Sequence, residues 1–305
     1  MALTPDGSRL FVALLTRAHG SAPNPDGYVA SFDLATQVKD RESHIADDPY
    51  DLIATSNARL VVSSGSGSTG SVRVLDAATG QQLGVVGNVD VRLRLTLHPS
   101  EGKLYAANTN SNPSDIRRFD LLAGGGISNK WDSPYHGEHR MDGNVWASPR
   151  GDALVTRGGD VFTAGSAQSE DMIYLAGLSE GTISDLTWDA AHSTIFTVEG
   201  SMVRYYDLTS RLEMGRHALS GTGSFVGVNG GQIYAGVPSL ASTRIESFAQ
   251  AALGGSTNTA PISRFRITPQ GDGTDVARHF APAARGLESC RTGVGNFRRR
   301  SLHNQ

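Results

Sequence analysis

Short runs in which apolar and polar residues alternate recur along most of the chain. The clearest stretch extends from Asp185 to Leu208 and contains three such runs, separated by a polar turn and by a tight turn at Glu199–Gly200. Strict alternation over four to eight residues is typical of a half-buried β-strand. The stretch therefore predicts most of a four-stranded antiparallel meander.

The same unit occurs six times when the units are aligned on the apolar residue that opens the second strand. These residues are Leu10, Leu60, Leu104, Leu154, Ile195 and Ile233. Third strands recur as well, starting at Tyr28, Ser71, Asp115, Met202 and Arg244, whereas the fourth unit offers only MIYLAGL from Met172. A strand-only repeat of 38 to 50 residues is typical of β-propeller blades, because one unit cannot bury its own apolar face.

The expected fold is an all-β propeller of six or seven four-stranded antiparallel blades, with incomplete blades at the two ends. The first unit lacks a recognisable innermost strand, and the sixth shows no fourth strand. Two arrangements satisfy this pattern: six blades closed by strands from both termini, or a seven-bladed ring that has lost pieces. The missing strands favour seven.

Three segments carry a family resemblance. They are Thr4–Gly7 with Leu10–Ala13, His98–Pro99 with Leu104–Asn108, and Val72–Gly80. They resemble the YVTN-type and lactonase-like β-propeller repeats, whose units combine a Pro-Asp-Gly turn with a following apolar strand and a later Asp-x-x-Thr-Gly turn. The resemblance covers residues 1–250 and implies the fold, while propellers include enzymes, ligand binders and scaffolds alike.

The composition changes after residue 250. Residues 251–260 are a linker of small residues, and residues 261–305 open with a segment that resembles the first strand of a PKD-type domain. The remainder has no alternation, so we expect a truncated PKD-like strand and an irregular or disordered tail. This resemblance implies a secreted, periplasmic or cell-surface protein. The chain opens in the middle of a repeat without a signal pattern, which suggests that an upstream part is missing.

Charge and cysteine content exclude several classes of function. The 305 residues carry a net charge of −3, with no basic face of the kind that binds nucleic acid. No apolar run approaches the 18 residues that a membrane span requires. Cys290 is the only cysteine, so an intrachain disulfide is impossible.

The strongest chemical cluster is His136, Glu138, His139 and Asp142. Two imidazoles and two carboxylates within seven residues could hold a divalent metal, Ca²⁺ or Zn²⁺, in the loop between the third and fourth blades. A solvated polar loop explains the same residues.

A second candidate site is the mouth of the central channel, where propellers commonly bind ligands. The starts of four inner strands offer polar side chains there: Tyr50 and Asp51, Arg92 and Arg94, Asp142 and Asn144, and Ser184 and Asp185. A solvated ring with hydrogen bonds between blades would look the same. Of the three tryptophans, Trp146 and Trp188 are expected in the core and Trp131 near the surface.

Two functions follow from these sites. The first is a binding or scaffold module of a secreted or surface protein, which recognises a small molecule, a glycan, a polymer or a protein at the channel mouth through Tyr50, Asp51, Asn144 and Ser184. The second is a metal-dependent hydrolase or lactonase. In that case Asp142 and Asp185 would be catalytic, and Arg92 or Arg94 would stabilise the oxyanion while the metal activates water.

Overall fold

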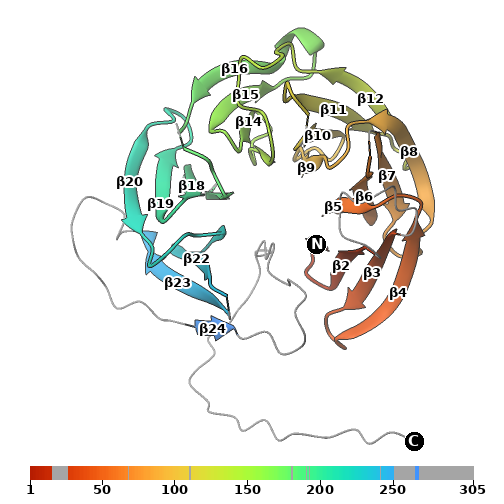
Figure 1. Cartoon of the computed structure of the whole chain (residues 1–305), viewed down its shortest axis with the longest axis horizontal. Coiled ribbons are helices and arrows are strands. Elements are labelled where there is room, and N and C mark those ends of the chain that lie inside the picture. Colours follow the sequence, from red (N-terminus) through yellow and green to blue (C-terminus); the bar gives the residue numbers. More distant parts are fainter. Residues whose placement is uncertain are drawn as a thin grey trace, which may run out of the picture.

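The computed structural model is a β-propeller of six four-stranded antiparallel sheets arranged around a central axis (Figure 1). It describes residues 1–15, 27–67, 69–109, 111–179, 181–189, 191, 193–240, 242–250 and, for the backbone, 265–267. The first three blades, from inner to outer strand, are β1 (Ala2–Leu3), β2 (Arg9–Leu14), β3 (Gly27–Asp33) and β4 (Val38–Ile45); β5 (Pro49–Ala54), β6 (Arg59–Ser64), β7 (Gly70–Asp76) and β8 (Gln82–Val89); and β9 (Arg94–Leu97), β10 (Lys103–Ala107), β11 (Ile116–Leu121) and β12 (Ile127–Asp132). The last three are β13 (Val145–Ala147), β14 (Ala153–Thr156), β15 (Asp160–Ala164) and β16 (Asp171–Gly177); β17 (Asp185–Asp189), β18 (Thr194–Glu199), β19 (Met202–Asp207) and β20 (Glu213–Ala218); and β21 (Phe225–Asn229), β22 (Gln232–Pro238), β23 (Thr243–Ala249) and β24 (Phe265–Ile267).

The predicted fold class is confirmed, and the described residues form six blades. The preference for seven was wrong, because β1 and β24 complete the first and sixth blades. Each of the six aligned apolar residues lies in the second strand of its blade, and the turn at Glu199–Gly200 joins β18 to β19. Gly200 has a φ of 58°, a left-handed conformation that glycine adopts without steric cost.

Two details of the strand assignment were wrong. The first blade does have an innermost strand, because Ala2 and Leu3 pair with Phe11 and Leu10. In the fourth blade, the third strand is β15, and the MIYLAGL segment contributes the outer strand β16. The reason is a very short turn: Gly159 has a φ of 87°, and its N–H donates to the carbonyl of Thr156, so the chain reverses within a few residues.

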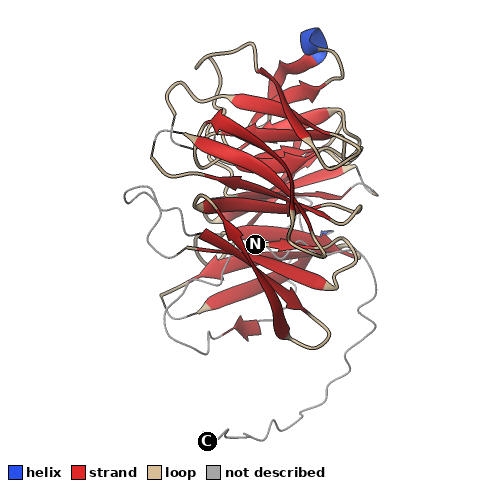
Figure 2. Ribbon diagram, turned by 90° about the vertical axis from the view of Figure 1, so that its right-hand side faces the viewer, coloured by secondary structure: helices blue, strands red, loops and turns tan. Residues whose placement is uncertain are grey.

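The sixth blade obtains its outer strand from beyond the predicted linker. Residues Phe265–Ile267 pair with Thr243–Ile245 in β23. The residues around β24, from 251 to 264 and from 268 to 305, lie outside the described part of the chain, as does most of the segment from which the PKD resemblance was inferred. The only helix among the described residues is a short 3₁₀ turn, Gln168–Glu170, at the periphery (Figure 2).

The hydrophobic core is divided among the junctions between neighbouring blades. The described residues form five clusters of buried side chains, and each joins two consecutive blades, from the first and second through to the fifth and sixth. At the junction of blades five and six, for example, Phe196 and Val198 of β18 pack against Ile233 and Ala235 of β22. Sheets that are apolar on both faces are buried only when they stack in this way.

The sixth junction differs from the other five. Blades six and one are the two ends of the arc in Figure 1, and among the described residues no hydrophobic cluster combines them. The side chains that face this junction are nevertheless apolar and half-buried. They include Leu10, Val12 and Phe32 from the first blade and Phe225, Tyr234 and Ile245 from the sixth.

Candidate binding cavity at the centre of the ring

A cavity of about 500 Å³ lies between the inner strands of the first four blades. Its volume is within the range of roughly 300–1,000 Å³ that is usual for small-molecule sites. The lining residues are Met1–Pro5, Asp51–Ala54, Arg94–Leu97 and Asn144–Trp146. Three of the predicted channel residues, Asp51, Arg94 and Asn144, are therefore brought together.

Asp51 and Arg94 form an ion pair at this cavity. The Asp51 Oδ1 atom is 3.7 Å from Nη1 of Arg94, and the two side chains are 15% and 16% exposed. The carboxylate of Asp51 also accepts two backbone hydrogen bonds, from Leu52 N–H at 3.0 Å and from Leu95 N–H at 2.9 Å. These bonds hold the Asp51 carboxylate in a fixed position between β5 and β9.

The guanidinium of Arg94 is positioned by an aromatic ring instead of by hydrogen bonds. It lies over the ring of Tyr50, 4.5 Å from the centroid, which is a cation–π contact. The guanidinium donates no hydrogen bond to a described residue, since its contact with Asp51, at 3.7 Å, is longer than a hydrogen bond. Its N–H groups therefore remain able to donate to a molecule in the cavity.

Asn144, Thr96 and Trp146 complete the polar part of the lining. The Oγ1 atom of Thr96 accepts a hydrogen bond from Ala147 N–H at 3.0 Å, which leaves the hydroxyl hydrogen able to donate. Trp146, expected in the core, packs partly against the cluster between blades four and five and also lines the cavity. The sequence predicted that Trp146 lies on an inner strand, but it did not predict that this residue also lines a cavity.

Asp185, a predicted catalytic residue, links two blades and is not part of the cavity lining. Its side chain is 7% exposed, and its Oδ2 atom accepts Val226 N–H from the next inner strand at 2.9 Å, much as Asp51 accepts Leu95 N–H. Burial raises the pKa of Asp185 to about 6, although hydrogen bonds from Val226, Leu186 and Trp146 act in the opposite direction. Asp51 and Asp185 thus both connect neighbouring inner strands, Asp51 between blades two and three and Asp185 between blades five and six.

The other predicted channel residues have separate positions. Asp142 is exposed, and its carboxylate lies 3.3 Å from Nη1 of Arg157. Arg92 has a φ of 56°, and its carbonyl accepts the hydroxyl of Thr109 at 2.9 Å. Ser184 donates its N–H to the carbonyl of Val198. Asp142, Arg92 and Ser184 do not contribute to the cavity lining.

The four predicted metal ligands face different partners. His136 lies 3.7 Å from Asp115, and Glu138 accepts the backbone N–H of His136. His139 stacks on Tyr174, with ring centroids 4.1 Å apart, and lies 3.9 Å from Asp160. Within the described ranges, no three His, Cys, Asp or Glu side chains are grouped to hold a metal. A bound Ca²⁺ or Zn²⁺ stays a prediction from the sequence.

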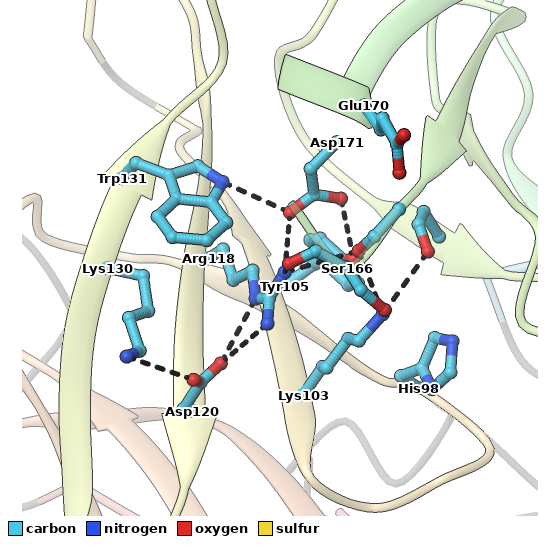
Figure 3. A network of polar contacts seen from close by, with 12 residues as sticks. His98, Lys103, Tyr105, Arg118, Asp120, Lys130, Trp131, Ser166, Glu170 and Asp171 are labelled. Atoms are coloured by element: carbon cyan, nitrogen blue, oxygen red, sulfur yellow. Dashed lines mark hydrogen bonds and ion pairs between the residues drawn. The ribbon is translucent and has the colours of Figure 1, made fainter. Parts of the chain in front are cut away.

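A buried polar network between blades three and four was not found from the sequence (Figure 3). Asp171 of β16 is fully buried and accepts hydrogen bonds from Tyr105 at 2.8 Å, Arg118 at 3.0 Å and Trp131 at 3.1 Å. Burial, with the nearby charge of Asp171, raises the pKa of Tyr105 far above its ordinary value, so the phenol stays a donor. The partners lie 40 to 66 residues from Asp171 in sequence, so no local motif marks them.

Comparisons with known proteins show the fold alone. No protein-family model matches the chain, and no curated protein is significantly similar to it in sequence. A chain of the mitotic checkpoint complex superposes with a TM-score of 0.62 at 13% identity, covering 89% of this chain and 77% of that one. The Cps50 (Swd1) β-propeller domain of Myceliophteria thermophila gives 0.58 at 14% identity, with 83% of each chain covered. Hydrazine synthase of Kuenenia stuttgartiensis gives 0.59 at 16%, covering 80% and 75%.

The similarity to these structures is one of fold, the β-propeller, which hosts enzymes, ligand binders and scaffolds alike. The described residues contain no helix with the length and apolarity that crossing a bilayer demands.

Proposed function

We propose that this protein is a propeller-type binding module that recognises its ligand in the cavity between the first four inner strands. The observation that carries the proposal is the Arg94 guanidinium, which is held over Tyr50 and paired with Asp51 at 3.7 Å but donates no hydrogen bond to a described residue. A binding site needs such positioned and unsatisfied polar groups inside a mostly apolar concavity.

The ligand classes in view are a small molecule, a glycan, a polymer or a protein segment that can enter the cavity. The YVTN and PKD resemblances support a secreted, periplasmic or surface-displayed protein. The lining contains neither a cysteine nor a histidine, and its one carboxylate, Asp51, is held by two backbone N–H groups. The lining thus offers no thiol or imidazole, and its one carboxylate is already paired with Arg94, which supports recognition over nucleophilic catalysis.

The test is a binding screen with wild type and an Arg94→Gln/Asn144→Ala double variant. Immobilised protein is exposed to glycan, polymer and extracellular-protein panels and read by surface plasmon resonance. We expect a ligand of the wild type whose binding falls at least tenfold in the double variant. Equal binding by both proteins would place the recognition surface elsewhere on the propeller and refute the proposal.

The hydrolase alternative has no observation in its favour among the described residues and stays a prediction. Elemental analysis by ICP mass spectrometry, before and after EDTA, tests its first requirement. Stoichiometric Ca²⁺ or Zn²⁺ that is lost on His136→Ala or His139→Ala, together with chelator-sensitive turnover of lactones or esters, would support it. Absence of both would leave the binding module alone.

A further inference from the structure

The outer strand of the second blade, β8, has an edge without charged residues. Its eight residues, Gln82–Val89, include neither a charged side chain nor a proline. Proteins commonly protect an unpaired strand edge with lysine, other charges or proline, because its free N–H and C=O groups can pair with another chain. The outer strands of the first, third and fifth blades follow this rule and carry Lys39 and Glu42, Lys130 and Asp132, and Glu213 and Arg216.

The backbone of β8 is open along this edge. In the second sheet β8 is the last strand, so it is paired with β7 on one side only. No hydrogen bond from a described residue outside β7 reaches the β8 backbone. The outer strand β16 also lacks an exposed charge, but the hydroxyl of Tyr135 accepts its Tyr174 N–H at 3.1 Å, and two irregularities interrupt its pairing with β15. Its edge is therefore protected, whereas that of β8 is not.

Exposed apolar side chains lie beside the β8 edge. Leu83 is 38% exposed, Val85 45% and Leu122 48%. Leu83 adjoins the turn between β11 and β12 that begins with Leu122, since a Cβ atom on Gly125 of this turn would lie 2.7 Å from Cδ1 of Leu83. These three side chains can be covered when a further strand adds to β8.

A strand of this kind is its own complement. Antiparallel pairing of two β8 strands places no charge opposite a like charge, and it forms a two-fold contact that closes at the dimer. Residues 84–87, which pair with β7 without a register shift, provide a regular run for this contact.

We propose that β8 is a self-association surface, on which a second copy of this chain adds its own β8 in the antiparallel direction. Leu83, Val85 and Leu122 of the two copies cover the contact. The surface lies on the outer rim of the ring, and the cavity lies among the inner strands, so the two sites are independent (Figure 1).

The experiment is sedimentation velocity of the whole chain at increasing concentration. A contact of one strand per copy is smaller than a stable interface, so we expect a monomer at about 1 µM and a growing fraction of dimer towards about 500 µM. Val85→Lys places charge on the edge and should raise the dissociation constant of the dimer about tenfold or more. The matched control is Val38→Lys, since Val38 is 55% exposed on β4, an outer strand that already carries charges.

Hydrogen exchange read by mass spectrometry tests the strand addition itself. Amides of β8 should exchange about twofold or more slowly at the higher concentration, because their free N–H groups become paired, while amides of β4 should not change. Val85→Lys should remove this concentration dependence. Circular dichroism of both lysine variants verifies that they are folded.

Three results would overturn the proposal. The wild type could stay monomeric throughout, Val38→Lys could weaken the dimer as much as Val85→Lys, or the dimer could form without slower exchange in β8. A monomeric wild type would leave an extended segment of another protein as the occupant of this edge. The Arg94→Gln/Asn144→Ala double variant should dimerise like the wild type, so a failure here is distinct from a failure of the cavity as a binding site.

Discussion

The two faces of the sixth blade carry similar side chains in different surroundings. One face presents Val226, Ile233 and Phe248, which are at most 5% exposed because the fifth blade packs on them. The opposite face presents Phe225, Tyr234 and Ile245, which are half-buried and belong to no cluster among the described residues. Successive side chains of a strand point to opposite faces, so the apolar residues at both sets of positions in this blade make both of its faces apolar, but only stacking against a neighbour converts such a face into core.

The same contrast holds for the first blade. Its Phe11 and Val29 are buried against the second blade, whereas Leu10 and Phe32, on the other side of the same strands, are half-buried. Stability should therefore be concentrated at the five junctions that have clusters. The following predictions measure this difference.

Matched phenylalanine truncations should give the largest effect. Phe196→Ala removes a fully buried ring between blades five and six and should lower the free energy of unfolding by about 3–5 kcal/mol. Phe32→Ala, on the unclustered side of blade one, should cost about 1 kcal/mol because the ring is only half-buried. Urea unfolding followed by circular dichroism measures both values. Similar losses would show that the sixth junction is packed as well as the others.

The buried network between blades three and four should give the next largest effect. Asp171→Asn removes the charge that pairs with Arg118, whose side chain is 6% exposed, and should destabilise by about 3 kcal/mol. Glu42→Gln breaks an exposed pair with Lys39 and serves as the control, with an expected loss of 0–1 kcal/mol. Thermal unfolding monitored by circular dichroism compares the two variants. A small effect of Asp171→Asn would mean that the network adds little to this junction.

The pH dependence of stability should show the cost of burying Asp185. Its pKa in the folded state, about 6, is above the ordinary value of 3.8, so the folded state binds the proton more tightly than the unfolded state. This contribution is present below pH 4 and is lost as the pH rises from about 4 to 6, and its size is up to about 3 kcal/mol. Asp185→Asn should flatten that part of the stability profile, which urea titrations between pH 4 and pH 7 measure. An unchanged profile would mean that Asp185 titrates normally.

Hydrogen exchange should give the smallest difference. Amides of β2 and β3, next to the unclustered junction, should open with a free energy about 1–2 kcal/mol below that of β10 and β11, which are clustered on both sides. Native-state exchange read by mass spectrometry resolves the two peptide sets. Equal protection would indicate a ring that opens as one unit.

The sequence predicted the repeating geometry well, because it is encoded locally. Alternation placed all six second strands correctly, and counting back from them located the starts of the inner strands near Asp51, Arg94 and Asp185. The segment Asp160–Ala164 was missed as a strand because its turn is unusually short, so the period of the repeat did not help.

The candidate site was predictable only in part. Asp51, Arg94 and Asn144 could be assigned to the channel because inner strands face the axis, but the sequence did not separate them from Asp185, which has the same local pattern and is buried. Which of two equivalent aspartates is covered depends on the neighbouring blade. The Asp171 network depends on contacts between distant strands, and these have no periodic signal.

The position of the cavity has a consequence for the cooperativity of the whole ring. In a linear array of blades each unit interacts with its nearest neighbours only, so unfolding can start at an end and proceed inwards. The cavity is lined by residues of blade one and of blade four, which are not neighbours. A ligand held there adds a coupling between non-adjacent units and stabilises the assembled state by mass action. Ligand binding at this site should therefore raise the free energy that is needed to unfold the terminal blade.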